Sequence, residues 1–218
     1  MTTKELDEEA GAVIRALGGK SAFLGYRGYP ANICISVNDE VVHGIGRPDR
    51  FLLKGDVVSI DLGVDLDGGV GDNARTIYLG DDPPERVARL LDQTNAALMA
   101  GIAAAKAGNY ICDISAAIES VAKRNGFGVV REYVGHGCGT KMHEPPEVPN
   151  FSSRNRGPRL VPGMVLAIEP MFNLGTHKVY MESDNWTVRT CDGKVSAHFE
   201  HMALISENQT EVLTCLKM

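Results

Sequence analysis

The chain has 218 residues, of which 44% are hydrophobic, 23% charged and 6% aromatic. These fractions are typical of a globular domain with a sizeable core and exclude a disordered or low-complexity chain. The 28 acidic residues outnumber the 22 basic ones and give a formal net charge of −6, so we expect no specific nucleic-acid partner and no attraction to an anionic membrane.

The first predicted helix begins at Thr3, whose hydroxyl can cap it, and ends at Gly18 and Gly19. Residues spaced by three and four positions form one apolar face: Leu6, Ala10, Val13, Ile14 and Leu17. The segment is acidic and has no long apolar run, so we expect neither a signal peptide nor a membrane span. Five scattered cysteines without a C-x-x-C pair indicate a reducing compartment, the cytoplasm.

Two further helices are predicted in the middle of the chain. The second begins at Asp82 and Pro83 and runs to Gly108, with an apolar face of Val87, Leu90, Leu91, Leu98, Ile102 and Ala105. The third begins at Asp113 and stops at Asn125 and Gly126, with a buried face of Ile114, Ala117, Ile118 and Val121. Residues 56–61 and 163–169 follow strand periodicity instead. The predicted class is therefore α+β or mixed α/β, and we favour α+β.

An internal repeat is indicated by two strand sequences, GDVVSID from Gly55 and GMVLAIE from Gly163, each of which ends on a carboxylate. The first and third helices repeat at nearly the same spacing. We therefore expect a single catalytic domain over residues 1–218, built of pseudo-symmetric halves of about 1–82 and 83–218 with antiparallel sheets covered by helices. The second half begins with a long helix, so the repeat predicts a corresponding helix before Met1. Without that helix, the first half-sheet should expose an apolar strip.

Two aspartates flank a predicted hairpin. Asp61 and Asp72 lie on either side of the turn sequence Asp67-Gly68-Gly69, which is close to the midpoint between them. We therefore expect the two aspartates to face each other directly across the hairpin. Directly opposite residues have Cβ atoms about 4.5–5.5 Å apart. Two inward-facing carboxylates that close repel each other unless a cation or a shared proton lies between them. The alternative is a solvated hairpin with acidic flanks.

Three more residues complete the candidate site. His136 lies among glycines in Gly135 to Gly139, Glu169 ends an apolar strand, and Glu200 ends the alternating run 195–199. Four carboxylates and one imidazole suit Mn(II), Fe(II), Co(II) or Zn(II), and bridging carboxylates can hold two such ions about 3.5–4 Å apart. The set predicts metal-assisted hydrolysis.

These motifs, together with LGYRGYP from Leu24 and ICISVNDEVVHGI from Ile33, stand in the order and spacing of the type I methionine aminopeptidases, which the chain resembles from Thr3 to Leu213. The resemblance implies the pita-bread fold, without the first N-terminal helix of that family. It also implies removal of the initiator methionine from nascent polypeptides whose second residue is small, by a monomeric enzyme that contacts the ribosome transiently.

The resemblance further implies a role for each site residue. Asp72 and Glu200 would bridge two metal ions, Asp61 would complete one shell, and His136 with Glu169 would complete the other. Glu169 would also carry the proton, and His43 and His143 would act on the scissile region without being ligands. The residues expected to contact substrate are Phe23, Tyr26, Tyr29, Cys34, His43, Met142, His143 and Trp186.

Some positions depart from the family pattern. Phe23 stands where a smaller residue is common, Met142 replaces a usual phenylalanine, and Asn185 replaces a usual glycine, so pocket shape is affected more than chemistry. We interpret His198 and Cys138 as packing residues. His177 is interpreted as a solvent-exposed loop residue.

Two alternative functions stay open at this point. A proline-specific aminopeptidase or dipeptidase of the same fold would share all five ligands, although such enzymes carry a substantial extra N-terminal domain. A catalytically weak binding module of this fold would be expected to lose ligands, and all five are present.

Overall fold

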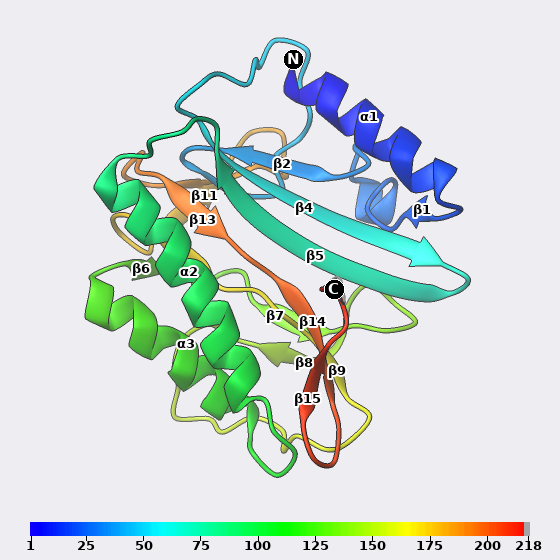
Figure 1. The fold of residues 1–218 in the computed structure, drawn as a ribbon, viewed down its shortest axis with the longest axis vertical. Coiled ribbons are helices and arrows are strands. Elements are labelled where there is room, and N and C mark those ends of the chain that lie inside the picture. Colours follow the sequence, from blue (N-terminus) through cyan, green and yellow to red (C-terminus); the bar gives the residue numbers. More distant parts are fainter. Residues whose placement is uncertain (216–218) are drawn as a thin grey trace.

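A computed structural model describes residues 1–215, in which three long helices lie outside small antiparallel sheets (Figure 1). The helices are α1 (Thr3–Ala16), α2 (Glu85–Ala104) and α3 (Ile111–Asn125), and a short 3₁₀ turn, η1 (Tyr26–Gly28), follows α1. Helix α1 covers the sheet of the N-terminal part, whereas α2 and α3 lie side by side over the C-terminal part. The predicted α+β class is confirmed.

The first sheet contains β1 (Lys20–Ser21), β2 (Cys34–Val37), β4 (Val57–Leu66) and β5 (Gly69–Tyr78). Its central hairpin turns through Asp67 and Gly68, both in the left-handed region with φ of 53° and 83°, which matches the twist of antiparallel strands. Because this turn has only two residues, Leu66 pairs with Gly69. Asp61 consequently pairs with Ala74 and Asp72 with Gly63. The prediction that Asp61 and Asp72 face each other directly was wrong by two residues of register.

Helix α1 is capped by Thr2 rather than Thr3, through a reciprocal pair of hydrogen bonds with Glu5. Its predicted apolar face is only partly correct, because Val13 and Leu17 are 49% and 77% exposed. The helix is turned so that Asp7 is buried: its carboxylate accepts hydrogen bonds from the backbone N–H groups of Asn32 and Ile33 at 2.7 and 3.0 Å. This polar anchor sets the rotation of the helix over β2.

Beneath α1, buried Ile14 packs with Ile33, Ile35, Val37 and Val58. The outer face of β4 is covered only in part, since Ile60, Leu62 and Val64 remain half-buried and Ile77 on β5 is 37% exposed. The expected apolar strip is therefore a row of partly covered side chains.

Helices α2 and α3 enclose the larger core. Helix α2 begins at Glu85, later than predicted, because the preceding Pro84 disfavours helical backbone at Pro83. Helix α3 begins at Ile111, with Asp113 accepting a hydrogen bond from the Tyr110 N–H at 2.8 Å, and Gly126 ends it at φ 69°. Their buried faces match the predicted stripes apart from half-buried Leu91 and Ala117.

Below these helices lies a five-stranded sheet in the order β15-β14-β9-β7-β8. Its strands are β7 (Gly135–Gly137), β8 (Glu144–Val148), β9 (Val165–Ile168), β14 (His201–Ile205) and β15 (Thr210–Val212). Another sheet joins β13 (Ser196–His198), β10 (Met171–Asn173) and β6 (Gly128–Val129). The predicted strand at 163–169 is confirmed as β9.

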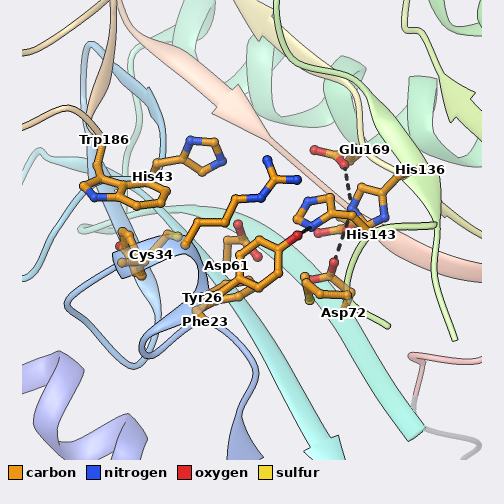
Figure 2. A pocket seen from close by; sticks show the side chains of 14 residues that line it. Phe23, Tyr26, Cys34, His43, Asp61, Asp72, His136, His143, Glu169 and Trp186 are labelled. Carbon is orange, nitrogen blue, oxygen red and sulfur yellow. Dashed lines mark hydrogen bonds and ion pairs between the residues drawn. The ribbon is translucent and has the colours of Figure 1, made fainter. Parts of the chain in front are cut away.

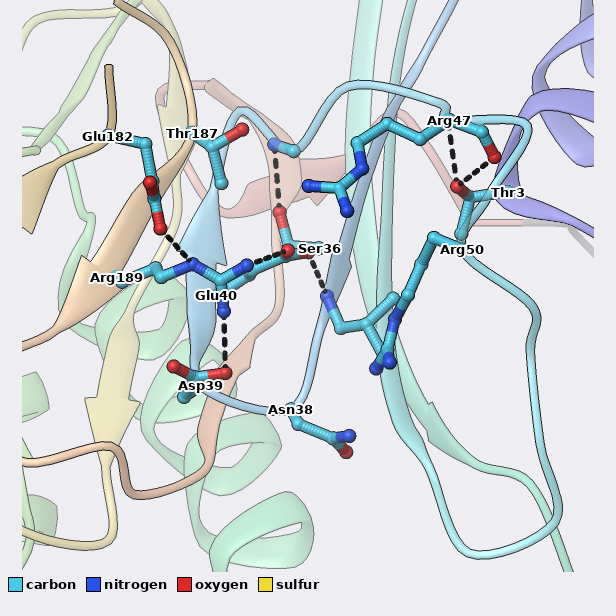
Figure 3. A network of polar contacts seen from close by, with 12 residues as sticks. Thr3, Ser36, Asn38, Asp39, Glu40, Arg47, Arg50, Glu182, Thr187 and Arg189 are labelled. Carbon is cyan, nitrogen blue, oxygen red and sulfur yellow. Dashed lines mark hydrogen bonds and ion pairs between the residues drawn. The ribbon is translucent and has the colours of Figure 1, made fainter. Parts of the chain in front are cut away.

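A last sheet joins distant parts of the chain: β11 (Val179–Met181), β12 (Val188–Thr190) and β3 (Glu40–Val42). Arg189 on β12 binds three carboxylates, those of Asp39 and Glu40 at 2.8 and 2.7 Å and that of Glu182 at 2.5 Å (Figure 3). These ion pairs hold the β11–β12 hairpin against β3. The loop that follows β3 and the turn between β11 and β12 are thereby fixed relative to each other.

Candidate metal centre and substrate pocket

Three of the five predicted ligands come from, or next to, the first hairpin. Asp61 and Asp72 point to the same face of β4 and β5, as diagonal neighbours. Glu200, just before β14, donates its backbone N–H to the Ala74 carbonyl at 2.8 Å, which brings it to the edge of β5. Residues far apart in sequence therefore present carboxylates to one point.

The other two predicted ligands come from the five-stranded sheet. His136 on β7 pairs with Ala167 on β9, and Glu169 directly follows that strand. The Nδ1 atom of His136 lies 2.9 Å from the Gly137 carbonyl, which requires a proton on Nδ1 and leaves a lone pair on Nε2. That Nε2 atom lies 3.6 Å from Asp72 and 3.6 Å from Glu169 (Figure 2).

The five side chains divide into overlapping sets. Donor atoms of His136, Glu169 and Glu200 lie within 4.8 Å of one another, as do those of Asp61, Asp72 and Glu200. Glu200 belongs to both sets, and Asp72 reaches His136 as well. Asp72 and Glu200 are only 2% exposed. One buried oxygen on each of three carboxylates has no hydrogen-bond donor among residues 1–215: Asp61 Oδ1, Asp72 Oδ1 and Glu200 Oε1.

Burial and mutual repulsion perturb these carboxyl groups. Burial raises the pKa of Asp61 and Asp72 well above the usual range, and a neighbouring carboxylate, Asp72 for Asp61 and Glu169 for Asp72, raises each further. The pKa of Glu200 is raised in the same way, by burial and then by Asp72. Burial raises the pKa of Glu169 to about 7, although nearby His136 opposes that rise.

A cation would stabilise this site. Unpaired carboxylate oxygens in a buried cluster are costly unless a positive charge or a bound proton compensates them. Oxygen donors with one imidazole nitrogen fit divalent transition metals, and shared carboxylates suit a pair of ions. The residues therefore fit the metal-assisted hydrolysis that the sequence predicts.

A cavity of about 160 Å³ opens directly onto this centre. All eight residues expected to contact substrate line it. The ring of Tyr29 meets Phe23 and Trp186 edge-on, at 6.4 and 5.0 Å between centroids. The Tyr29 hydroxyl donates to the Gly44 carbonyl at 2.9 Å, and the Ile33 carbonyl lies 3.2 Å from it. The phenol ring is thereby held in place. The inner wall is apolar and closed by Phe23, Cys34 and Met142.

The family departures are accommodated locally. Asn185, before Trp186, has φ of 64°, in the left-handed region that glycine favours and asparagine tolerates. The Phe23 ring lies against Gly63 of β4, where a Cβ atom would come within 2.6 Å of the ring. Phe23 therefore fills space that glycine leaves beside Asp61.

Two further histidines line the cavity, and the ring of one of them, His143, lies 4.2 Å from that of the predicted ligand His136. His43, at φ 60°, packs edge-on against Tyr133 and Trp186, and burial lowers its pKa to about 4. His143 stacks on Tyr26, and its Nδ1 atom lies 2.9 Å from the Tyr26 hydroxyl. Burial and then His136 lower the pKa of His143 to about 4. Both imidazoles are therefore neutral at pH 7.

Three residues at the centre were not predicted to have a role there. Arg27 lines the cavity mouth, between Gly25 and Gly28. Cys138 lies near Asp72 and His136, with its donor atom within 4.8 Å of theirs. His198, interpreted as a packing residue, lies 3.5 Å from Glu169. The sequence pattern could have indicated His198. It lies in the alternating run 195–199, two residues before Glu200, and residues two positions apart point to the same side.

The model of the metallopeptidase family M24 matches residues 1–207. The chain belongs to this family. Its members are metal-dependent peptidases, and the pita-bread fold of the family is the arrangement of helices and antiparallel sheets described above. Within the described part of the chain, no helix is both long and apolar enough to cross a membrane.

Relatives within family M24 are similar over almost the whole chain. Methionine aminopeptidases of Clostridium acetobutylicum and Bacillus subtilis are 46% and 47% identical, each over 98% of this chain and 85% and 86% of the relative. The crystal structure of methionine aminopeptidase from Rickettsia prowazekii superposes with a TM-score of 0.95 at 37% identity, covering 99% of this chain and 86% of that one. A prolidase from Pyrococcus furiosus, at 23% identity and a TM-score of 0.76, shares the fold; this chain spans 57% of it.

Proposed function

We propose that this M24 chain is a methionine aminopeptidase that removes the initiator methionine from polypeptides whose second residue is small. The observation that carries the proposal is that the five-residue centre and a closed apolar pocket share one cavity. Apolar and aromatic walls suit the flexible, polarisable thioether of methionine. The relatives that match at 46–47% identity are methionine aminopeptidases.

We propose two divalent ions, Co, Mn, Fe(II) or Zn, held by Asp61, Asp72, His136, Glu169 and Glu200. Asp72 and Glu200 belong to overlapping donor sets, which supports a bridging role for them. When bound, such ions supply a hydroxide nucleophile at neutral pH and polarise the scissile carbonyl.

Protein side chains transfer the proton of the attacking water and stabilise the negative charge of the tetrahedral intermediate. Glu169, whose pKa is raised to about 7, is suited to take a proton from water and deliver it to the leaving amine. If Tyr26 donates its hydroxyl proton to His143 Nδ1, the His143 proton is on Nε2 and can be donated to the tetrahedral intermediate. His43, whose ring packs against Trp186, would donate a second hydrogen bond to the tetrahedral intermediate.

A peptide assay tests the proposal. Purified protein loaded in turn with Mn(II), Co(II), Fe(II) or Zn(II) should release methionine from Met-Ala-Ser and leave Ala-Pro and Gly-Pro-Ala intact. Met-Lys-Ser serves as the control for the second residue, because a small residue is expected there. Cleavage confined to X-Pro peptides would favour the proline-specific alternative, and inactivity with every metal would favour the binding module.

The cellular setting is also a proposal. The substrates would be nascent polypeptide N-termini, met during transient contact with the ribosome in the cytoplasm. The enzyme would act as a monomer with residues 1–218 as one catalytic domain. Division into halves of about 1–82 and 83–218 is supported by β4, which contains Asp61, and β9, which is followed directly by Glu169.

A further inference from the structure

His198, the last residue of β13, is buried to the point that only 1% of it is exposed. Neither of its ring nitrogens has a hydrogen-bond partner among residues 1–215. A buried polar group without a partner costs free energy, and native proteins rarely keep one without a reason. A residue that served only to fill space would be better replaced by an apolar side chain of similar volume.

The backbone of His198 is held by hydrogen bonds on both sides, and burial leaves its ring little room to turn. Its N–H donates to the Thr76 hydroxyl at 2.8 Å, and that hydroxyl donates to the His198 carbonyl at 2.7 Å. Because Thr76 has used its only proton, the Ser59 hydroxyl, 2.8 Å away, donates to it. On its other side the strand pairs with Met171 of β10.

The buried ring of His198 faces one oxygen of the Glu169 carboxylate, and His136 faces the other. Glu169 Oε1 lies 3.6 Å from His136 Nε2, and Oε2 lies 3.5 Å from His198 Nε2. Each oxygen of one carboxylate thus faces a different imidazole. Rotation of the carboxylate about its last bond would break both contacts, so the two rings together define its plane.

We propose that His198 is a positioning residue whose Nε2–H donates to Oε2 of Glu169 and so orients the carboxylate for proton transfer. The inference rests on the proposed function, in which Glu169 carries the proton. A charge-assisted hydrogen bond is about 2.7–2.9 Å long, shorter than the present contact. Such bonds are often long in substrate-free enzymes and shorten in the working complex.

Two substitutions separate the hydrogen bond from packing. His198→Gln keeps an N–H donor of similar reach, whereas His198→Met keeps bulk and removes the donor. We expect His198→Met to lower kcat for Met-Ala-Ser by about 10–100-fold, as loss of a supporting partner does in metal sites, with KM, metal content and melting temperature unchanged. His198→Gln should restore most of the turnover. His177→Met, the loss of an imidazole outside the cavity, should have no effect.

A second measurement does not depend on activity. In metal-free protein with ¹⁵N-labelled histidine, we expect NMR to show His198 protonated at Nε2, and the Glu169→Gln substitution to shift that signal while the His177 signal stays in place. If the wild-type enzyme released no methionine, the proposed function would fail, and this shift would still test the His198 contact with Glu169.

Four results would overturn the proposal. Wild-type kcat in His198→Met, or equal losses in the Met and Gln variants, would leave His198 a packing residue. Loss of metal in His198→Met would make it a ligand. An NMR signal unaffected by Glu169→Gln would show that no hydrogen bond joins the two side chains.

Discussion

Asp61 and Asp72 are diagonal neighbours on one face of the β4–β5 hairpin, and the Glu200 carboxylate completes a set of donors with them within 4.8 Å. Because Asp72 and Glu200 each reach two groups of donors, replacing either should remove oxygens from both of the proposed ions. We expect Asp72→Ala and Glu200→Ala to lose both metal ions and all activity, and Asp61→Ala to keep part of its metal. Elemental analysis after dialysis measures this, with Asp65→Ala on the same hairpin as control; full occupancy in Asp72→Ala would refute the bridging assignment.

The metal-free protein should lose stability as pH rises from about 6.5 to 8. The buried carboxyls have raised pKa values, about 7 for Glu169, so the folded chain binds more protons than the unfolded one in this range. Below 6.5, histidines with lowered pKa, such as His43 and His143, oppose this effect because they favour proton uptake on unfolding.

Thermal melts at several pH values check this expectation. The melting temperature of the metal-free protein should fall by several degrees between pH 6.5 and 8, and the Asp72→Asn variant should show a smaller decrease. Loading with metal should reverse the trend, because the ions neutralise the same carboxylates. A metal-free melting temperature that rises over this range would contradict the direction of the pKa shifts.

Loss of His143 should impair turnover without loss of metal. A donor aimed at a developing oxyanion contributes about 10²–10³ in rate, so His143→Ala should lower kcat by that factor at unchanged metal content. Tyr26→Phe should have a smaller effect, because it removes only the hydroxyl that orients the ring. Steady-state kinetics with elemental analysis measures both, and a metal-depleted His143→Ala would instead make this histidine a ligand.

The pocket wall can be altered from behind, through Gly63. A Cβ atom there would come within 2.6 Å of the Phe23 ring, so Gly63→Ala should push the ring into the cavity. We expect KM for methionyl peptides to rise and stability to fall by about 1–3 kcal/mol, the usual cost of overpacking. Gly71→Ala on β5, where a Cβ meets nothing within 4 Å, is the control. Unchanged KM in Gly63→Ala would show that Phe23 does not limit the pocket.

Helix α1 depends on one buried carboxylate. Asp7 accepts the backbone N–H groups of Asn32 and Ile33, and Asp7→Ala leaves these buried donors without a partner, at about 1–3 kcal/mol. In a chain of this size, each kcal/mol lowers the melting temperature by about 2–4 °C. Glu8→Ala, one position along on the exposed side, should melt near the wild type. Equal melting temperatures for the two variants would show that α1 is held by apolar packing alone.

Part of the centre could be predicted from sequence because Glu169 and Glu200 follow short buried strands, whereas Asp61 and Asp72 lie within β4 and β5. Such a pattern forces Glu169 and Glu200 into the interior, where a carboxylate needs compensation. Convergence of the five residues, by contrast, depends on contacts such as that of the Glu200 N–H with Ala74, which pairs segments far apart in sequence. The resemblance to a known family supplied that link.

Other features could not be predicted because tertiary contacts override local pattern. Val13 and Leu17 have the right spacing for burial, yet the hydrogen bonds of Asp7 rotate α1 away from them. The turn at Asp67 and Gly68 could be located from sequence, but its two-residue length moves the register two residues from the predicted one. His198 lies two residues before Glu200 in sequence, yet only the fold shows that Glu169 lies beside it.

The joining of Glu200 to the edge of β5 has a consequence for synthesis. During translation the β4–β5 hairpin, which carries two of the aspartates, is synthesised well before residue 200. Its contact with the Glu200 N–H, through the Ala74 carbonyl, can form only once that segment has been synthesised. Metal capture is therefore one of the last events in maturation. A ribosome-bound chain ending before Phe199 should therefore bind metal weakly, because it lacks the proposed ligand Glu200.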